Sequence, residues 1–186
     1  SNAQYVIAED YLLSIVTVTP DIAVGTQVKD EFPAFYFEWA RGLMDQQLYS
    51  DAVIILEHLV IAYPDSELSE QANATLVDAQ VAAIMSSGAA GELPSPQTSG
   101  ESSGGELVLY DVTNDTVCPI VVLMSGPESK ATTFAPETNL QVELPAGTYN
   151  IVVQTDGSQE LISDCQNISP FFYRFFKIKS RAAQDI

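Results

Sequence analysis

The side chains that could act as a nucleophile or a general base are few in this chain of 186 residues. His58 is the only histidine, and it stands beside Glu57 on a predicted helix with no credible nucleophile to activate. The expected role of His58 is that of an exposed helical side chain. No glycine-rich loop follows a strand in the way that phosphate binding requires. We therefore predict that the protein is not an enzyme and has no catalytic residue.

Two short patterns resemble sites but lack the surroundings that their chemistry needs. Residues 100–104 match the Gly-x-Ser-x-Gly motif of hydrolases, which works only between a buried strand and a helix. More serine and glycine flank it here, so we interpret the match as an accident of composition. Asp111, Asn114 and Asp115 carry oxygen atoms suited to calcium, yet the spacing and the glycine of a calcium-binding loop are missing. We predict no metal site and no cofactor.

The two cysteines, Cys118 and Cys165, both lie in the second half of the chain. A zinc site is not expected, because the chain has no Cys-x-x-Cys pair and a single histidine. One disulfide between them is the simplest use. It would close a loop of about fifty residues and stabilise the fold by about 4 kcal/mol if chain entropy dominates. Two free cysteines remain the alternative.

The formal charge of −18 is unevenly distributed along the chain. Residues 1–105 hold fifteen acidic side chains against only Lys29 and Arg41, while residues 106–186 hold ten against five basic ones. Such a field repels nucleic acid and anionic lipid, so neither is an expected partner. A basic protein partner is one interpretation of the acidity, and solubility alone is the simpler one.

The N-terminal residues Ser1-Asn2-Ala3 look like the remnant of a cleaved tag and are left out of the fold prediction. The natural precursor could therefore carry a signal peptide or a lipid anchor before these residues, and this question is left open. The visible chain has no run of about eighteen apolar residues, so no membrane span is predicted within it.

A linker divides the chain. Thirteen of the twenty residues 86–105 are serine, glycine or proline, and such a stretch cannot bury enough apolar area to offset its ordering entropy. Hydrophobic periodicity is helical before it and has a period of two after it. The predicted organisation is therefore a helical domain over residues 4–85 and a β-domain over residues 106–182.

The helical half shows three stretches of helical spacing, over residues 32–45, 51–63 and about 66–85. Ser50 or Asp51 is expected to cap the second of these helices. Residues 4–18 are apolar and end in β-branched residues, so a helix is favoured there while a strand stays open. The helix over 51–63 is apolar on nearly every side and needs a cover. We expect residues 4–19 to provide it in a four-helix array, and a second copy of the protein is the alternative.

Five residues of this half fall at the spacing of a known repeat: Ala40, Tyr49, Ala52, Leu56 and Pro64. Residues 33–66 resemble a tetratricopeptide repeat, a 34-residue helix–turn–helix unit, and residues 67–85 resemble the first helix of another. The resemblance implies that the two alanines let the helices approach closely, that Tyr49 wedges at the turn and that Pro64 ends the second helix. The ending at 63–66 is similar to repeats of bacterial envelope proteins. Leu59 departs from the pattern, which expects glycine or alanine there.

The β half has five legible strands, over residues 106–112, 119–125, 140–144, 148–155 and 171–180. The turn Pro145-Ala146-Gly147 is expected to join the third and fourth of them as a hairpin. Six or seven short antiparallel strands in this length predict a small β-sandwich. The predicted fold class is therefore multidomain, α then all-β, with a short antiparallel α-hairpin array joined by a flexible linker to the sandwich.

Two segments of the β half, SGPESK (125–130) and LPAGTYNIVV (144–153), resemble parts of small β-sandwich modules of bacterial secreted and envelope proteins. The second segment is similar to carboxypeptidase-regulatory-like and PEGA-type domains. The resemblance implies an accessory, non-catalytic module. It also implies a location outside the cytoplasm: in the periplasm, in the cell envelope or secreted.

These observations predict a non-catalytic interaction or scaffold protein outside the cytoplasm. Its helical domain is expected to bind a protein partner, with homo-oligomerisation through that domain left open. The runner-up is an envelope carbohydrate-binding protein that acts through the β-sandwich. Its platform would be the aromatic cluster at 171–176, although core packing explains a cluster rich in phenylalanine better.

Overall fold

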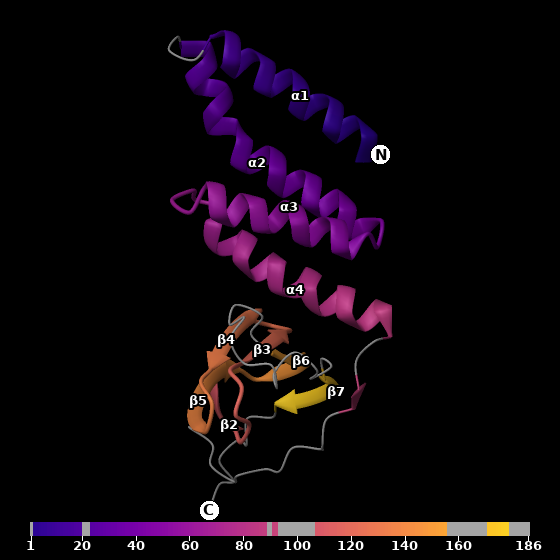
Figure 1. Cartoon of the computed structure of the whole chain (residues 1–186), viewed down its shortest axis with the longest axis vertical. Coiled ribbons are helices and arrows are strands. Elements are labelled where there is room, and N and C mark those ends of the chain that lie inside the picture. Colours follow the sequence, from indigo (N-terminus) through magenta and orange to yellow (C-terminus); the bar gives the residue numbers. More distant parts are fainter. Residues whose placement is uncertain (1, 20–22, 89–90, 93–106, 156–170, 179–186) are drawn as a thin grey trace, which may run out of the picture. The chain divides into compact units, whose positions relative to one another are not determined.

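The computed structural model describes residues 2–19, 23–88, 91–92, 107–155 and 171–178 (Figure 1). Four helices come first along the chain and strands follow, which confirms the predicted α-then-β layout. The chain forms two compact units, Ser1–Ala79 and Gln80–Ile186. The boundary lies within the fourth helix, earlier than the predicted linker at 86–105, most of which lies outside the described residues. The two units are described separately below.

The helices are α1 (Asn2–Val18), α2 (Ala23–Asp45), α3 (Tyr49–Ala62) and α4 (Ser69–Ser87). A helix in residues 4–18 is thereby confirmed, and it begins at Asn2, within the three residues that had been left out of the prediction. The second helix starts nine residues before the predicted Phe32 and continues through Pro33. Proline lacks only one backbone hydrogen bond of a helix, which a long packed helix can tolerate.

The turn between α2 and α3 is a Schellman motif. Gln47 takes a positive φ of 61°, its N–H donates to the carbonyl of Met44, and the N–H of Leu48 donates to the carbonyl of Leu43, both at 2.9 Å. Helix α3 begins directly afterwards at Tyr49, and Leu48 makes no side-chain cap. The prediction that Ser50 or Asp51 caps this helix is therefore wrong, because the motif places both residues inside the first turn.

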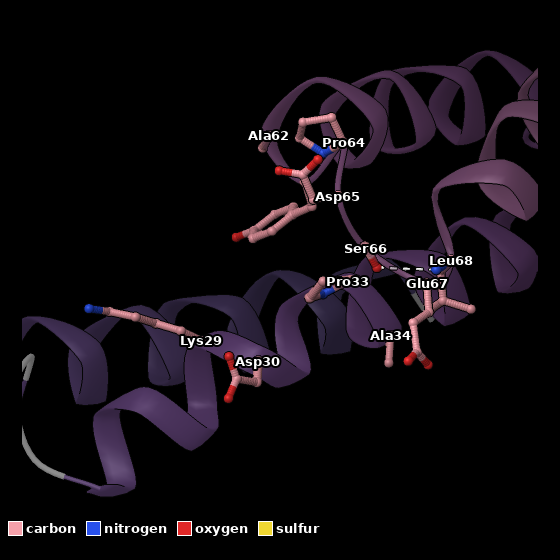
Figure 2. A pocket seen from close by; sticks show the side chains of 11 residues that line it. Lys29, Asp30, Pro33, Ala34, Ala62, Pro64, Asp65, Ser66, Glu67 and Leu68 are labelled. Atoms are coloured by element: carbon pink, nitrogen blue, oxygen red, sulfur yellow. Dashed lines mark hydrogen bonds between the residues drawn. The ribbon is translucent and has the colours of Figure 1, made fainter.

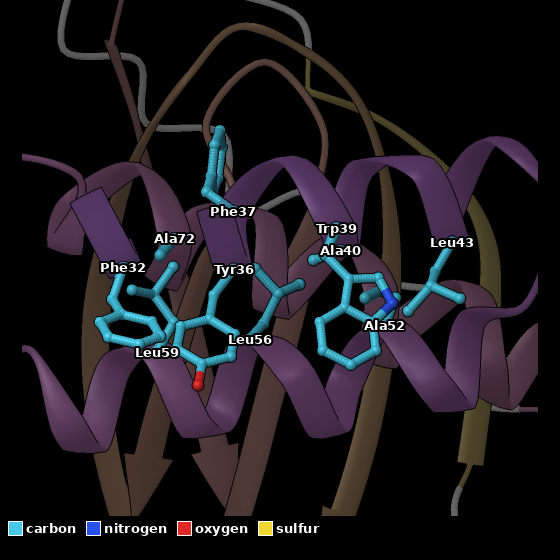
Figure 3. Close-up of a cluster of buried hydrophobic side chains, with 11 residues drawn as sticks. Phe32, Tyr36, Phe37, Trp39, Ala40, Leu43, Ala52, Leu56, Leu59 and Ala72 are labelled. Carbon is cyan, nitrogen blue, oxygen red and sulfur yellow. The ribbon is translucent and has the colours of Figure 1, made fainter. Parts of the chain in front are cut away.

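The core of the helical unit lies mainly between α2 and α3 (Figure 3). Ala40 and Ala52 are fully buried there, and their small side chains allow the two helices to pack closely. Leu56 and Leu59 of α3 fill the space beside Phe32, Tyr36 and Trp39. Ala72 and Ala79 of α4 belong to the same cluster. Only one side of α3 is buried in this way.

Helix α1 packs on α2 (Figure 1). The ring of Tyr5 stacks on Trp39 with centroids 5.7 Å apart, and Trp39 Nε1 donates to Asn2 Oδ1 at 2.7 Å. The expectation that residues 4–19 cover the apolar helix 51–63 is therefore wrong. On the outward face of α3, Ile54 is 62% and Ile61 79% exposed, and none of the described segments covers them. The sequence pattern shows that α3 is apolar all round, but it cannot show which neighbour each face meets.

One glycine of α2 is required by its contact with the end of α1. Gly25 is buried, and a Cβ atom there would overlap the carbonyl oxygen of Thr19. Glycine-to-alanine changes in helices ordinarily stabilise by about 1 kcal/mol, but we expect Gly25→Ala to lower the free energy of unfolding by about 1–3 kcal/mol. Denaturation followed by the fluorescence of Trp39, the only tryptophan, measures it.

Gly42 of the same helix is the matched control for this substitution. Its added Cβ would lie 3.3 Å from the phenol oxygen of Tyr5, the far end of a side chain that can move. Gly42→Ala is therefore expected to be neutral or stabilising. Equal effects of the two substitutions would contradict the close contact between Gly25 and Thr19.

The strands of the β-unit form two sheets. Their bounds are β1 (Gly91–Glu92), β2 (Leu107–Asn114), β3 (Ile120–Ser125), β4 (Lys130–Phe134), β5 (Thr138–Pro145), β6 (Gly147–Thr155) and β7 (Phe171–Ile178). The larger sheet has the order β1-β7-β6-β3-β4, with β1 parallel to β7 and the other pairs antiparallel. The smaller sheet is the antiparallel pair β2-β5. Side chains of both sheets share one core, in which Phe134, Leu144 and Tyr149 are fully buried.

The predicted hairpin around Pro145-Ala146-Gly147 is wrong. Strand β5 pairs with β2 in one sheet, whereas β6 pairs with β3 and β7 in the other. The chain therefore changes sheets at Ala146. The hydroxyl of Tyr149 donates to the carbonyl of Pro145 at 3.1 Å, the contact that a tyrosine corner makes in β-sandwich domains. Burial is the main cause that raises the pKa of Tyr149 above its usual value.

Candidate functional site

An open groove of about 550 Å³ lies in the helical unit between α2 and the α3–α4 turn (Figure 2). Four residues of α2 form one wall: Lys29, Asp30, Pro33 and Ala34. They recur at i, i+1, i+4 and i+5, so they share one face of that helix. The other wall is the continuous segment 62–68, from the last residue of α3 to the residue before α4.

Local hydrogen bonds fix the shape of the second wall. The N–H of Tyr63 closes α3 by donating to the carbonyl of Leu59, at 3.0 Å. The N–H of Ser66 donates to the carbonyl of Tyr63 at 3.1 Å, and the Ser66 hydroxyl accepts from the N–H of Leu68 at 3.2 Å (Figure 2). Pro64 suits this turn, because it cannot continue a helix. The segment is therefore ordered by its own bonds before any partner binds.

Aromatic rings anchor the same segment to the core. Tyr63 stacks on Phe32 with centroids 6.4 Å apart and lies 6.1 Å from the ring of Tyr36. The hydroxyl of Tyr36 donates to Glu9 Oε1 of α1 at 2.7 Å. Burial is the largest cause that raises the pKa of Tyr36 above its usual range, and the hydrogen bond and charge of Glu9 raise it further. Burial also raises the pKa of Tyr63, so the protein environment favours the neutral form of both phenols.

His58 is exposed on α3, as predicted. Its ring meets that of Tyr36 edge-on, with centroids 4.7 Å apart. The Tyr36 hydroxyl already donates to Glu9, so this cluster joins α1, α2 and α3 as a packing contact. The cluster of Glu9, Tyr36 and His58 is therefore a structural contact that holds the three helices beside the groove.

The lining of the groove is mixed in character. Pro33, Ala34 and Leu68 supply apolar surface, and Tyr63 adds an aromatic ring. Three carboxylates lie among them, on Asp30, Asp65 and Glu67, against the single ammonium of Lys29. Apolar contact combined with an excess of negative charge suits a ligand that carries both apolar and cationic groups.

The structure brings together three of the five repeat-like residues. Ala40, Ala52 and Leu56 are fully buried in one cluster. Tyr49 is half-buried as the first residue of α3, and Pro64 is exposed just after that helix ends, in the wall of the groove. The groove itself was not predicted. Pro64-Asp65-Ser66 was interpreted only as a helix stop, and the additional start of α2 that carries Lys29 and Asp30 was missed.

In the β-unit, Asn114 is a structural residue. It is almost fully buried, and its Nδ2 lies 2.8 to 3.2 Å from the carbonyl oxygens of Cys118, Phe134 and Ala135. Its Oδ1 accepts from the backbone N–H and the hydroxyl of Thr116, at 3.1 and 2.7 Å. Of the three residues with oxygen atoms suited to calcium, Asn114 is engaged in this turn, and Asp111 Oδ1 accepts from Gln141 Nε2 at 2.9 Å.

Cys118 is fully buried and is disulfide-bonded. Cys165 lies outside the described residues, as does the Gly-x-Ser-x-Gly segment 100–104, so the pairing of Cys118 with Cys165 stays a prediction. The side chains at 171–176, on which the sugar-binding alternative depends, are also outside the description. That alternative therefore gains no support here.

Within the described ranges, no three His, Cys, Asp or Glu residues are grouped so that they could hold a metal ion. No helix in the same ranges has the length and apolar character needed to cross a membrane. No protein-family profile matches the chain, and the comparisons with curated proteins and with solved structures give no significant match either.

Proposed function

We propose that the protein is a non-catalytic interaction protein whose helical unit binds a peptide segment of another protein. The observation that supports this proposal is the groove between α2 and the 62–68 segment, whose lining combines apolar side chains with three carboxylates. Its walls are held by local hydrogen bonds and by the Phe32–Tyr63 stack, so little ordering cost accompanies binding. The partner segment would be extended, with lysine or arginine beside apolar residues.

The α2–α3 pair is proposed to be a single tetratricopeptide-like unit, which accords with the close packing at Ala40 and Ala52. The β-unit is proposed to be an accessory module of the carboxypeptidase-regulatory-like or PEGA type. A location outside the cytoplasm is proposed as well. The buried disulfide at Cys118 supports it, because disulfides persist in oxidising compartments.

Peptide selection tests the proposal. A display library of random twelve-residue peptides is panned against the whole chain, and the affinities of enriched peptides are measured by fluorescence anisotropy. We expect enriched peptides to combine basic and apolar residues. Asp30→Asn combined with Glu67→Gln should weaken their binding about tenfold, which corresponds to roughly 1.4 kcal/mol, because two charge-assisted contacts with the basic peptide are lost.

The control removes the same charge outside the groove. Asp51→Asn combined with Glu57→Gln changes two exposed carboxylates of α3 that do not line the groove, and it should alter affinity by less than about twofold. If both double variants weakened peptide binding equally, the effect would come from general charge attraction. That result would contradict the groove as the binding site.

A further inference from the structure

Helix α1 carries an exposed apolar stripe that no described segment covers. Ile7 is 56%, Tyr11 69% and Val18 79% exposed, and Ser14 completes a spacing of four, three and four residues. The opposite side of α1 packs on α2 through Tyr5 and other apolar residues. None of the seventeen residues of α1, all of which the structure describes, is fully buried. The helix is therefore apolar on two sides and packed on one.

The spacing of the stripe is that of paired helices. Alternating steps of three and four residues keep side chains on the seam where one helix meets another. Helix α1 is about 25 Å long at 1.5 Å per residue, and the seam from Ile7 to Val18 extends about one and a half turns on either side of its midpoint. That midpoint lies between Tyr11 and Ser14.

A shallow apolar groove of about 470 Å³ adjoins one end of the stripe, bounded by Ile15, Val18 and Val24 together with Ser14 and Thr19. In an antiparallel pair of α1 helices centred between Tyr11 and Ser14, Ile7 of one copy lies opposite Val18 of the other. Each copy then presents an apolar knob at one end and a groove for it at the other. The surface is complementary to itself, as a two-fold symmetric interface requires.

The distribution of charge on α1 permits a second copy and disfavours an anionic membrane. The chain is strongly acidic, so two copies meet most easily where carboxylates are sparse. Within α1, Glu9 is turned toward α2 and accepts the hydrogen bond of Tyr36, and Asp10 would oppose Ile15 rather than a second Asp10. Helix α1 has no lysine or arginine, which helices that lie on anionic membranes carry.

We propose that two copies of this chain associate through an antiparallel pairing of their α1 helices. A seam of one helix from each copy is small for an interface, and interfaces below about 1,200 Å² in total belong to transient complexes. The expected dimer is therefore in reversible exchange with the monomer, with a dissociation constant on the order of micromolar. Each dimer would present two copies of the peptide groove.

Sedimentation equilibrium of the whole chain tests the association. The mass is expected to rise from that of the 20.1 kDa monomer toward twice that value as the concentration approaches about 100 µM. Tyr11→Asp combined with Val18→Asp should weaken association at least thirtyfold, because each copy would place two charges in the apolar seam, opposite Ser14 and Ile7 of the other copy. Both positions are exposed, so the fold should be retained, and circular dichroism verifies this.

Ile54→Asp combined with Ile61→Asp is the matched control. It adds the same charge at two exposed isoleucines of α3, and it should leave the association within about twofold. A wild-type chain that stays monomeric at 200 µM would overturn the proposal. So would equal loss of association in the two double variants, because that would place the effect in net charge alone.

Crosslinking tests the orientation. When the single variants Ile7→Cys and Val18→Cys are mixed and mildly oxidised, the mixed disulfide should form at least tenfold faster than either homodimeric one. Faster homodimeric crosslinking of each variant would indicate parallel helices and would overturn the antiparallel arrangement.

Discussion

Replacing Leu56 with alanine is expected to lower the free energy of unfolding of the helical unit by about 2–5 kcal/mol. Leu56 is fully buried between α3 and α2, beside Tyr36 and Trp39 (Figure 3). Truncation removes the transfer free energy of the side chain and leaves a cavity that the fixed aromatic rings around it cannot fill. Because Trp39 is the only tryptophan and lies in this core, its fluorescence during urea unfolding reports on the helical unit alone.

Ile54→Ala is the control for this experiment. Ile54 belongs to the same helix and loses side-chain volume similar to that lost by Leu56, but it is exposed. Its substitution should change the free energy of unfolding by less than about 0.5 kcal/mol. Comparable losses at the two positions would mean that the outward face of α3 is covered in solution.

The second large effect is expected at Asn114, where alanine should destabilise the β-unit by about 2–4 kcal/mol. The substitution removes the donors that serve the carbonyls of Cys118, Phe134 and Ala135, and it also removes the acceptor of Thr116. The carbonyls of Cys118 and Ala135 keep a hydroxyl donor, from Thr116 and Thr138, but all three carbonyls lose the buried amide. Its removal also leaves an unfilled space in the turn. Hydrogen exchange of the β3 and β4 amides, read peptide by peptide, measures the loss within this unit.

Asn139→Ala provides the matched control. Asn139 lies on β5, is exposed, and its Nδ2 donates to the Thr113 hydroxyl on β2, at 2.7 Å. Its removal should leave exchange of the same amides within about twofold. If Asn114→Ala were equally mild, the buried network would not be what holds the turn between β2 and β3.

The sequence predicted the class of each half because apolar periodicity is a local property. The helix at 51–63 and strands such as 119–125 were found within a few residues of their bounds. Turn geometry was predicted less well. Gln47 occupies a left-handed position that glycine usually fills, so the Schellman motif and the uncapped start of α3 left no clear mark in the residue types.

Pairing between elements was the other failure, and it has one physical cause. Residues 140–144 and 148–155 look like a hairpin because a short turn joins them, but only three-dimensional packing decides that Tyr149 enters the shared core and the chain changes sheets. The packing of α1 on α2 and the groove at 62–68 likewise depend on contacts between distant residues. Lys29 and Asp30 face that groove only because α2 extends past Pro33.

The way α1 is attached also sets the order in which the helical unit opens. Helix α1 has no fully buried residue. It is held by two polar contacts, Tyr36 to Glu9 and Trp39 to Asn2, by the stack of Tyr5 on Trp39 and by a few partly buried apolar side chains. Segments with so little buried surface detach at free energies well below that of global unfolding. When α1 detaches, Trp39 becomes exposed and an interface formed by α1 is lost. Local opening of α1 and self-association are therefore two legs of one thermodynamic cycle. Association therefore lowers the equilibrium constant for the opening of α1, and opening weakens association by the same factor.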